Sequence, residues 1–274
     1  MTDVVDDVVV ASDGTRLAVR RWGSDPTFLL VHGLASNARL WDGVAADLAA
    51  AGRGSIAVDQ RGHGRSDKPG VGFDFPTLSE DLHAVVGDDG PLVVVGQSWG
   101  GNVVLQLAAH HPDHVRGVVC VDGGFIRLAD AFRTREEMRT ELAPPRFDGL
   151  TASNLEAGMR ARLAGWPETA VTGQLGNFEQ LADGTVRARL ARDDHMTILD
   201  HLWDHDPDSL ADEIEVPILV VAVRGGHLAK EDRVAAFSAA HRNARLIWMD
   251  GDHDIHAQHP AAIAELLVDF EAGL

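Results

Sequence analysis

Residues 93–101 read VVVGQSWGG. This stretch places the pattern G-x-S-x-G, from Gly96 to Gly100, between a run of valines typical of a buried strand and a segment with helical periodicity. A sharp turn from strand to helix holds a serine in a strained conformation with its hydroxyl projecting from the edge of the sheet, and it requires small neighbours. We therefore expect Ser98 to be a nucleophile.

Apolar runs and helical segments alternate on both sides of this stretch. Continuous apolar runs separated by helices predict a mostly parallel sheet with helices on both faces. The turn residues Ser12-Asp13-Gly14 join the first two runs and predict a leading antiparallel hairpin. The expected strands are 4–10, 16–21, 28–31, 55–58, 92–95, 115–121, 218–223 and 244–248, and the expected helices are 40–51, 78–86, 100–110, 230–240 and 260–270.

Residues 125–215 break this alternation. They are richer in charged residues, contain Pro144-Pro145 and show helical rather than strand patterns. We predict a helical cap, or lid, inserted between two strands of the sheet. The core domain would then comprise residues 1–124 and 216–274.

A serine hydroxyl attacks only when a base removes its proton, and a carboxylate must hold that base in the right tautomer. His253 follows the last expected strand and precedes the last helix, which makes it the expected base; His256 and His259 are the competing histidines. The segment His32-Gly33-Leu34 follows another expected strand. We expect the backbone N–H groups of Leu34 and Trp99 to form an oxyanion hole.

Four segments together resemble the α/β-hydrolase superfamily, and the resemblance extends over essentially the whole chain. They are His32-Gly33-Leu34, residues 59–66 (DQRGHGRS), residues 96–101, and Gly251-Asp252-His253 with Pro260 beyond it. The resemblance implies the α/β-hydrolase fold, and it implies that residues 59–66 form a tight loop near the pocket in which Gly62 and Gly64 are structural. Relatives that open epoxides or remove halogens attack with aspartate, so Ser98 excludes both reactions.

The carboxylate is where the sequence departs from the commonest pattern of that superfamily. Most relatives carry an aspartate after the strand equivalent to 218–223, where this chain has Arg224-Gly225-Gly226-His227. A minority place the acid after the preceding strand, and Asp122 stands at that position here. Asp122 is the expected acid, with Glu231 and Asp232 as the alternatives.

Composition and charge exclude several classes of function. The chain has 274 residues and a formal net charge of −18, which disfavours nucleic acid and anionic membranes as partners. Its single cysteine cannot form an internal disulfide, and its acidic N-terminus is unlike a secretory signal, so we expect a cytoplasmic protein. The oligomeric state is open, and a homodimer is compatible with the sequence.

Neither a metal nor a cofactor is expected. His201-x-x-x-His205 and His253-x-x-His256 have ligand spacing but lack the glutamate of H-E-x-x-H. Aromatic and histidine side chains in the cap are expected to line an apolar pocket over Ser98. The candidate substrate contacts are Trp99, Phe125, Trp166, His195 and Trp203.

The expected function is hydrolysis of a carboxylic ester or lactone, with a small apolar molecule as substrate, through an acyl-enzyme. Ser98 would attack, His253 would relay the proton and Asp122 would orient His253. Two alternatives stay open. One is hydrolysis of a carbon-carbon bond in a diketone-like ring-cleavage product, and the other is a ligand sensor that keeps the scaffold without turnover.

Overall fold

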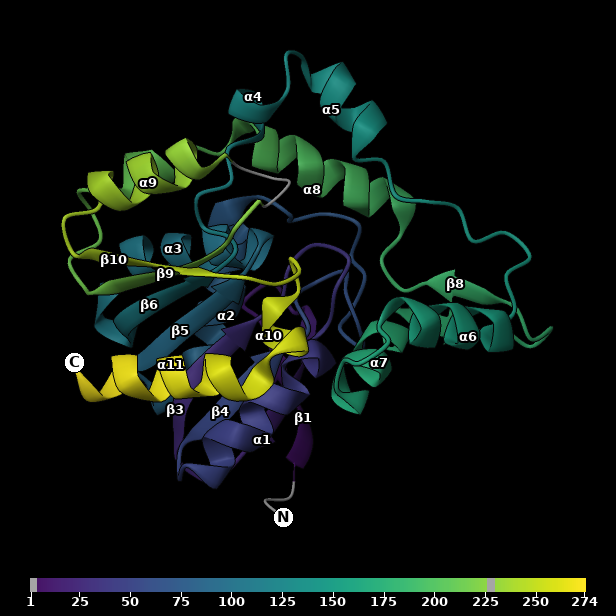
Figure 1. Cartoon of the computed structure of the whole chain (residues 1–274), viewed down its shortest axis with the longest axis horizontal. Helices are drawn as coiled ribbons and strands as arrows, with labels where there is room; N and C mark the ends of the chain where they lie inside the picture. The colour runs from purple at the N-terminus through teal and green to yellow at the C-terminus, as the bar shows by residue number, and fades with distance from the viewer. Residues whose placement is uncertain (1–3, 226–229) are drawn as a thin grey trace.

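An eight-stranded sheet forms the centre of the molecule (Figure 1). The structure is a computed structural model that describes residues 4–225 and 230–274. The strand order is β1-β2-β4-β3-β5-β6-β9-β10. At one edge β2 pairs antiparallel with both β1 and β4, and all the other pairs of neighbouring strands are parallel. The strands are β1 (Val4–Val10), β2 (Arg16–Trp22), β3 (Pro26–Val31), β4 (Gly54–Val58), β5 (Leu92–Gln97), β6 (Val115–Val121), β9 (Ile218–Val223) and β10 (Ala244–Met249).

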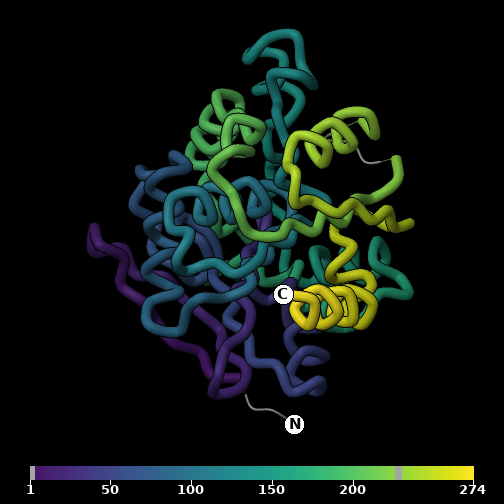
Figure 2. The backbone as a smooth tube through the Cα atoms, turned by 90° about the vertical axis from the view of Figure 1, so that its left-hand side faces the viewer, coloured from purple at the N-terminus to yellow at the C-terminus, as the bar shows by residue number. Residues whose placement is uncertain are grey.

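Helices cover both faces of this sheet, as the apolar runs predict. Successive residues of a strand point to opposite faces, so Phe28 and Leu30 of β3 join one apolar core while Leu29 and Val31 join the other. The helices α1 (Asp42–Ala50) and α11 (Pro260–Ala272) pack on the Phe28 face, and α2 (Phe75–Val86), α3 (Trp99–His110) and α9 (Glu231–Ala240) pack on the opposite face. Figure 2 shows the N-terminal hairpin and α11 on opposite sides of the molecule.

The expected helix at 40–51 is two elements, the 3-10 helix η1 (Ala38–Trp41) followed by α1. The helix α2 begins three residues earlier than expected because the side chain of Asp74 accepts a hydrogen bond from the Thr77 N–H and caps it. Three short elements complete the core: η2 (Gly87–Asp89), η3 (Pro112–His114) and α10 (Ile255–Gln258). In the described part of the chain, no helix has the length and apolar character needed to cross a bilayer.

The segment between β6 and β9 stands over one edge of the sheet (Figure 1), and we call residues 125–215 the cap. The cap also holds a two-stranded hairpin, β7 and β8, where the sequence indicates only helices. Its strands are three residues long, too short to show an alternation, and Gly184 with a φ of 83° makes its turn. The cap elements are α4 (Leu128–Ala131), α5 (Arg135–Glu141), α6 (Ala152–Arg162), α7 (Glu168–Leu175), β7 (Phe178–Gln180), β8 (Val186–Ala188), α8 (Arg192–Asp204) and η4 (Pro207–Leu210).

Candidate active site

Ser98 occupies the turn between β5 and α3, at the carboxyl edge of the sheet. Its φ of 52° and ψ of −126° are disfavoured for a residue with a side chain. The surrounding backbone holds this conformation: the Ser98 N–H donates to the Val121 carbonyl at 3.0 Å, and the Ser98 carbonyl accepts from the Gly101 N–H at 2.9 Å. A Cβ at Gly123 would lie 2.1 Å from the Ser98 carbonyl oxygen, so only glycine fits beside the turn.

Asp122 and His253 meet at the same edge of the sheet. Asp122 follows β6, and one of its carboxylate oxygens, Oδ2, lies 2.6 Å from Nδ1 of His253. The other oxygen, Oδ1, accepts a hydrogen bond from the Val223 N–H at 3.0 Å. The carbonyl of His253 accepts from the Gln97 side-chain amide at 3.1 Å. Both ends of the Asp122 carboxylate are therefore engaged, and the imidazole is fixed by its ring and its backbone.

The charge of Asp122 changes the acidity of His253. Burial lowers the pKa of His253, but the hydrogen bond and the negative charge of Asp122 outweigh burial, and Asp254 and Asp252 add to them. The net result is a pKa raised above the ordinary histidine value of 6.5. This arrangement stabilises the imidazolium that forms when His253 accepts a proton.

The alternative carboxylates lie elsewhere. Glu231 and Asp232 form the exposed first turn of α9, and within the described residues neither contacts His253. Of the segment that replaces the usual aspartate, Arg224 and Gly225 are described, while Gly226 and His227 lie outside the described residues.

The structure also describes the two competing histidines, His256 and His259. His256 is fully buried, its ring lies 4.3 Å from that of Trp41, and burial lowers its pKa to about 3. Neither ring nitrogen of His256 has a hydrogen-bond partner among the described residues. His259 directly follows α10 and precedes α11. Only His253 among these three lines the cavity that contains Ser98.

Leu34 and Trp99, whose backbone N–H groups are the expected oxyanion hole, line the same cavity as Ser98. Leu34 follows β3 in a loop, and Trp99 is the first residue of α3. In residues 4–225 and 230–274, neither N–H donates to a protein acceptor. The first N–H groups of a helix lack partners inside the helix and carry partial positive charge. The pair is suited to receive an oxyanion.

Two buried histidines fix the loop that carries Leu34. The Gln60 N–H donates to Nε2 of His32 at 3.1 Å, and Nδ1 of His32 donates to the Gly33 carbonyl at 2.7 Å. The Ala35 N–H donates to Nε2 of His63 at 3.3 Å. These roles require neutral rings, and burial lowers the pKa of His32 to about 4 and that of His63 well below its ordinary value.

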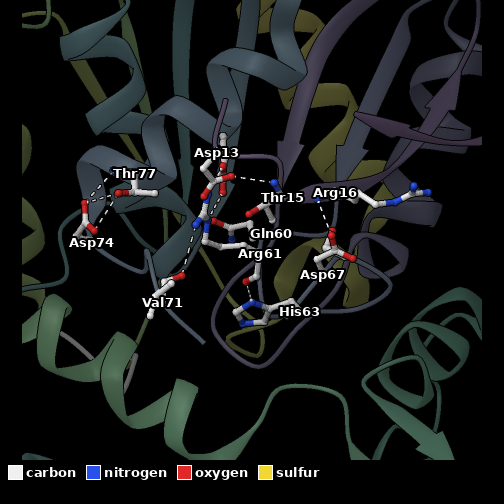
Figure 3. A network of polar contacts seen from close by, with 12 residues as sticks. Asp13, Thr15, Arg16, Gln60, Arg61, His63, Asp67, Val71, Asp74 and Thr77 are labelled. Carbon is white, nitrogen blue, oxygen red and sulfur yellow. Dashed lines mark hydrogen bonds and ion pairs between the residues drawn. The ribbon is translucent and has the colours of Figure 1, made fainter. Parts of the chain in front are cut away.

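Residues 59–66 form the tight loop that supplies His63, and Figure 3 shows the polar contacts of Arg61 with Asp13 and Val71 and of His63 with the Arg61 carbonyl. Arg61 is buried and pairs with both carboxylate oxygens of Asp81, at 2.5 and 2.6 Å, and with Asp13 at 3.0 Å. Gly64 has a φ of 44°, and a Cβ there would lie 2.2 Å from the Asp59 carboxylate. A side chain at Gly64 would therefore collide with Asp59, which accepts from the N–H groups of Ala38 and Arg65.

Ser98 opens into a cavity of about 200 Å³, which we call the serine cavity. A larger cavity of about 410 Å³, the cap cavity, lies among residues of the cap and the loops beneath it, and both cavities are lined by Leu142 and His195. Nε2 of His195 lies 3.2 Å from the Leu142 carbonyl oxygen. The residues lining the serine cavity are Leu34, Ser98, Trp99, Ile126, Leu128, Leu142, His195, Leu199, Leu202 and His253.

Two of the five expected substrate contacts, Trp99 and His195, line the serine cavity. The structure corrects the other three. Phe125 is buried in the core with its ring 6.4 Å from that of Phe237. Trp166 packs against the cluster of Leu40, Ala170 and Ala257. Trp203 packs against the core and lies under the guanidinium of Arg135, 5.8 Å away. All three rings pack against other side chains of the protein, and none of the three lines either cavity.

Leu199 and Leu202 were not expected at the site. They follow His195 on α8 by four and seven residues, which places all three on one face of the helix. This spacing is the signal that identifies them, because a helix covering a cavity presents one apolar face to it.

Known proteins resemble the chain in sequence and structure. Residues 26–260 match the family described as the alpha/beta hydrolase fold. The chain is 28% identical over 260 residues to the 2-(acetamidomethylene)succinate hydrolase of Mesorhizobium japonicum, covering 93% of this chain and 91% of that protein. It is 30% identical over 256 residues to a pimeloyl-[acyl-carrier protein] methyl ester esterase of Neisseria meningitidis, covering 89% and 93% of the two chains.

The likeness extends to three dimensions. The crystal structure of an E-2-(acetamidomethylene)succinate hydrolase superposes on this chain with a TM-score of 0.83 at 24% identity, covering 98% of this chain and 99% of that one. The superposition shows that the two chains share a fold.

Proposed function

The chain belongs to the α/β-hydrolase family, and we propose that it hydrolyses a carboxylic ester or a lactone through an acyl-enzyme. The observation that carries the proposal is the contact of 2.6 Å between Asp122 Oδ2 and His253 Nδ1 at the cavity that contains Ser98. That contact places the hydrogen of the neutral ring on Nδ1. Nε2 of His253 is then free to act as a base.

The first half of the reaction acylates the serine. Ser98 Oγ attacks the substrate carbonyl carbon while His253 Nε2 takes the hydroxyl proton. The carbonyl oxygen becomes an oxyanion held by the N–H groups of Leu34 and Trp99. When the tetrahedral intermediate collapses, the bond to the alkoxy oxygen breaks and His253 gives its proton to the leaving alcohol. In a lactone that alcohol remains attached to the acyl group.

The second half releases the acid. Water gives a proton to His253 and its oxygen attacks the acyl carbon, forming a second oxyanion at Leu34 and Trp99. Collapse breaks the bond to Ser98 Oγ, which recovers its proton from His253. The residues end in their starting states, and the balanced reaction consumes one water.

The cavities support an apolar acyl group as the part of the substrate next to Ser98. Ile126, Leu128, Leu142, Leu199 and Leu202 line the serine cavity. At about 200 Å³ it is smaller than sites for drug-sized ligands, which begin at about 300 Å³. A short acyl chain fits this volume. A longer substrate would continue past Leu142 and His195 into the cap cavity.

A fluorophosphonate probe tests whether Ser98 is an activated nucleophile. We expect covalent labelling of the wild-type protein, loss of labelling in Ser98→Ala, and full labelling in Ser36→Ala, a matched control at a buried serine that lines the neighbouring cap cavity. An unlabelled but folded wild-type protein would favour the ligand-sensor alternative.

A substrate panel tests the bond that is broken. Turnover should be compared on p-nitrophenyl acetate and butyrate, on a series of lactones, and on a vinylogous diketone. We expect turnover of the esters or lactones that is lost in Ser98→Ala. Activity confined to the diketone would replace this proposal with carbon-carbon bond hydrolysis.

A further inference from the structure

A cluster of histidines lies at the edge of the sheet opposite to Ser98. Glu80 lies in the middle of α2 and His83 near its C-terminal end, His111 directly follows α3, and His114 ends η3. The helix α3 begins beside Ser98 and runs for 12 residues, so the cluster is on the order of 18 Å from the candidate active site at 1.5 Å per residue. The cluster is therefore separate from the proposed reaction.

The side chains of Glu80, His83 and His111 lie close together. Oε1 of Glu80 lies 2.9 Å from Nε2 of His111, and Oε2 of Glu80 lies 4.0 Å from Nδ1 of His83. One ligand atom from each of the three residues lies within 4.8 Å of the others. The rings of His83 and His111 stack with their centroids 4.0 Å apart and an angle of 8° between them. Two imidazoles and a carboxylate are thus gathered from two packed helices.

His114 lies beside one ring nitrogen of His83. Nε2 of His83 lies 3.3 Å from Nε2 of His114, so a hydrogen on one nitrogen is shared with the other. When Nε2 of His83 donates, its Nδ1 keeps a lone pair on the side of Glu80. A histidine that binds a metal commonly donates its second ring N–H to a neighbouring acceptor, which fixes its tautomer and orientation. His114 is placed to be that acceptor.

We propose that Glu80, His83 and His111 form a binding site for a divalent transition metal ion, with Zn²⁺ as the best match, and that His114 positions His83. Imidazole and carboxylate ligands suit Zn²⁺, whereas Mg²⁺ and Ca²⁺ prefer oxygen ligands alone. Glu80 is half exposed, so water can complete the coordination. The ion would join α2 to the end of α3. Its role is to stabilise the fold, because the ligands do not reach the candidate active site.

The site is tested by titrating the full-length protein, freed of metal with a chelator, with ZnCl₂ in a calorimeter. We expect one ion per chain and a loss of affinity of about a hundredfold in His83→Ala and His111→Ala. We expect about a tenfold loss in His114→Ala, because removing a residue that orients a ligand typically costs 10- to 100-fold. His110→Ala is the matched control, since this neighbouring histidine pairs with Gln106, and it should bind Zn²⁺ within twofold of wild type.

A second measurement distinguishes a specific site from nonspecific binding of Zn²⁺. At about a hundredfold excess over the wild-type dissociation constant, Zn²⁺ should raise the Tm of wild type and His110→Ala by about 5 °C or more, and that of His83→Ala by no more than about 1 °C. The proposal is overturned if Zn²⁺ binds more weakly than about 1 mM, or if His83→Ala and His111→Ala bind and respond like wild type.

Discussion

Replacing Asp122 by asparagine should invert the tautomer of His253. The Val223 N–H, 3.0 Å from Oδ1, requires an acceptor there, so the asparagine oxygen would keep that position. The amide NH₂ would then take the place of Oδ2, which lies 2.6 Å from Nδ1 of His253. Because an NH₂ donates, Nδ1 would become the acceptor and the ring hydrogen would move to Nε2. A ring with hydrogen on Nε2 cannot take the proton of Ser98.

The expected size of this effect is large. In Ser-His-Asp enzymes the wrong histidine tautomer lowers turnover by about 10⁴-fold, which corresponds to about 5 kcal/mol of transition-state stabilisation. Asparagine has nearly the same shape as aspartate, so the fold should be kept. Turnover on p-nitrophenyl butyrate, or on the best ester or lactone of the panel, measures the loss, and circular dichroism verifies the fold.

The alternative acids provide the control for this experiment. Glu231→Gln and Asp232→Asn change exposed residues that do not contact His253 in the described structure, and both should turn over within twofold of wild type. The reasoning is refuted if Asp122→Asn keeps a tenth or more of wild-type turnover, and most clearly if one of the two control variants loses it.

Four further changes test other parts of the structure. Because the pKa of His253 is raised and its protonated ring is inactive, kcat/KM should rise with pH through a midpoint above 6.5, and a midpoint at or below 6.5 would contradict the assignment. Arg61→Met leaves the Asp81 carboxylate buried without a partner and should lower the free energy of unfolding, measured in urea, by about 3 to 5 kcal/mol. Arg65→Met, at a side chain 59% exposed, should lower it by less than about 1 kcal/mol. Equal losses in the two variants would show that the buried pair has no special role. Gly123→Ala, whose Cβ would lie 2.1 Å from the Ser98 carbonyl oxygen, should displace the serine turn and abolish fluorophosphonate labelling, and normal labelling would mean that the turn relaxes freely. Leu142→Trp, at a residue that lines both cavities, should obstruct an acyl chain that extends from the serine cavity into the cap cavity. It should reduce kcat/KM for an octanoate ester at least tenfold relative to acetate, while an unchanged ratio would mean that long chains take another route.

The order of strands and helices could be predicted from the sequence because the signals are local. Each buried strand is a continuous apolar run, and the turn at Ser98 requires glycines that are visible in the chain. The nearness of Asp122 to Ser98 also follows from this order, but its pairing with His253 does not, since Glu231 and Asp232 stayed open as alternatives. The carboxyl ends of neighbouring parallel strands meet at one edge, and Asp122 is the first residue after the strand next to that of Ser98.

The residues that line the cavities could not be predicted, because an aromatic side chain in the cap can either contact a substrate or pack against the core. Trp166 and Trp203 are as apolar as a substrate contact, but packing of the cap on the core uses both. The histidine cluster could not be identified from the sequence either. Glu80 and His83 show a ligand spacing of three residues, as do His111 and His114, yet only tertiary packing brings the two pairs together.

The neutral rings of His32 and His63 make the protein sensitive to acid in a way that is distinct from the titration of His253. An unfolded histidine has a pKa of about 6.5, whereas that of His32 in the fold is about 4, so the unfolded chain binds more protons between these values. Stability should therefore fall as the pH falls from about 6.5 to 4, by on the order of 3 kcal/mol for His32 alone. Below that range His32 loses the lone pair that accepts the Gln60 N–H, and the loop that carries Leu34 loses its support. Protonation of His253 would stop the proposed reaction reversibly, but a lower pH would disrupt the loop that carries Leu34.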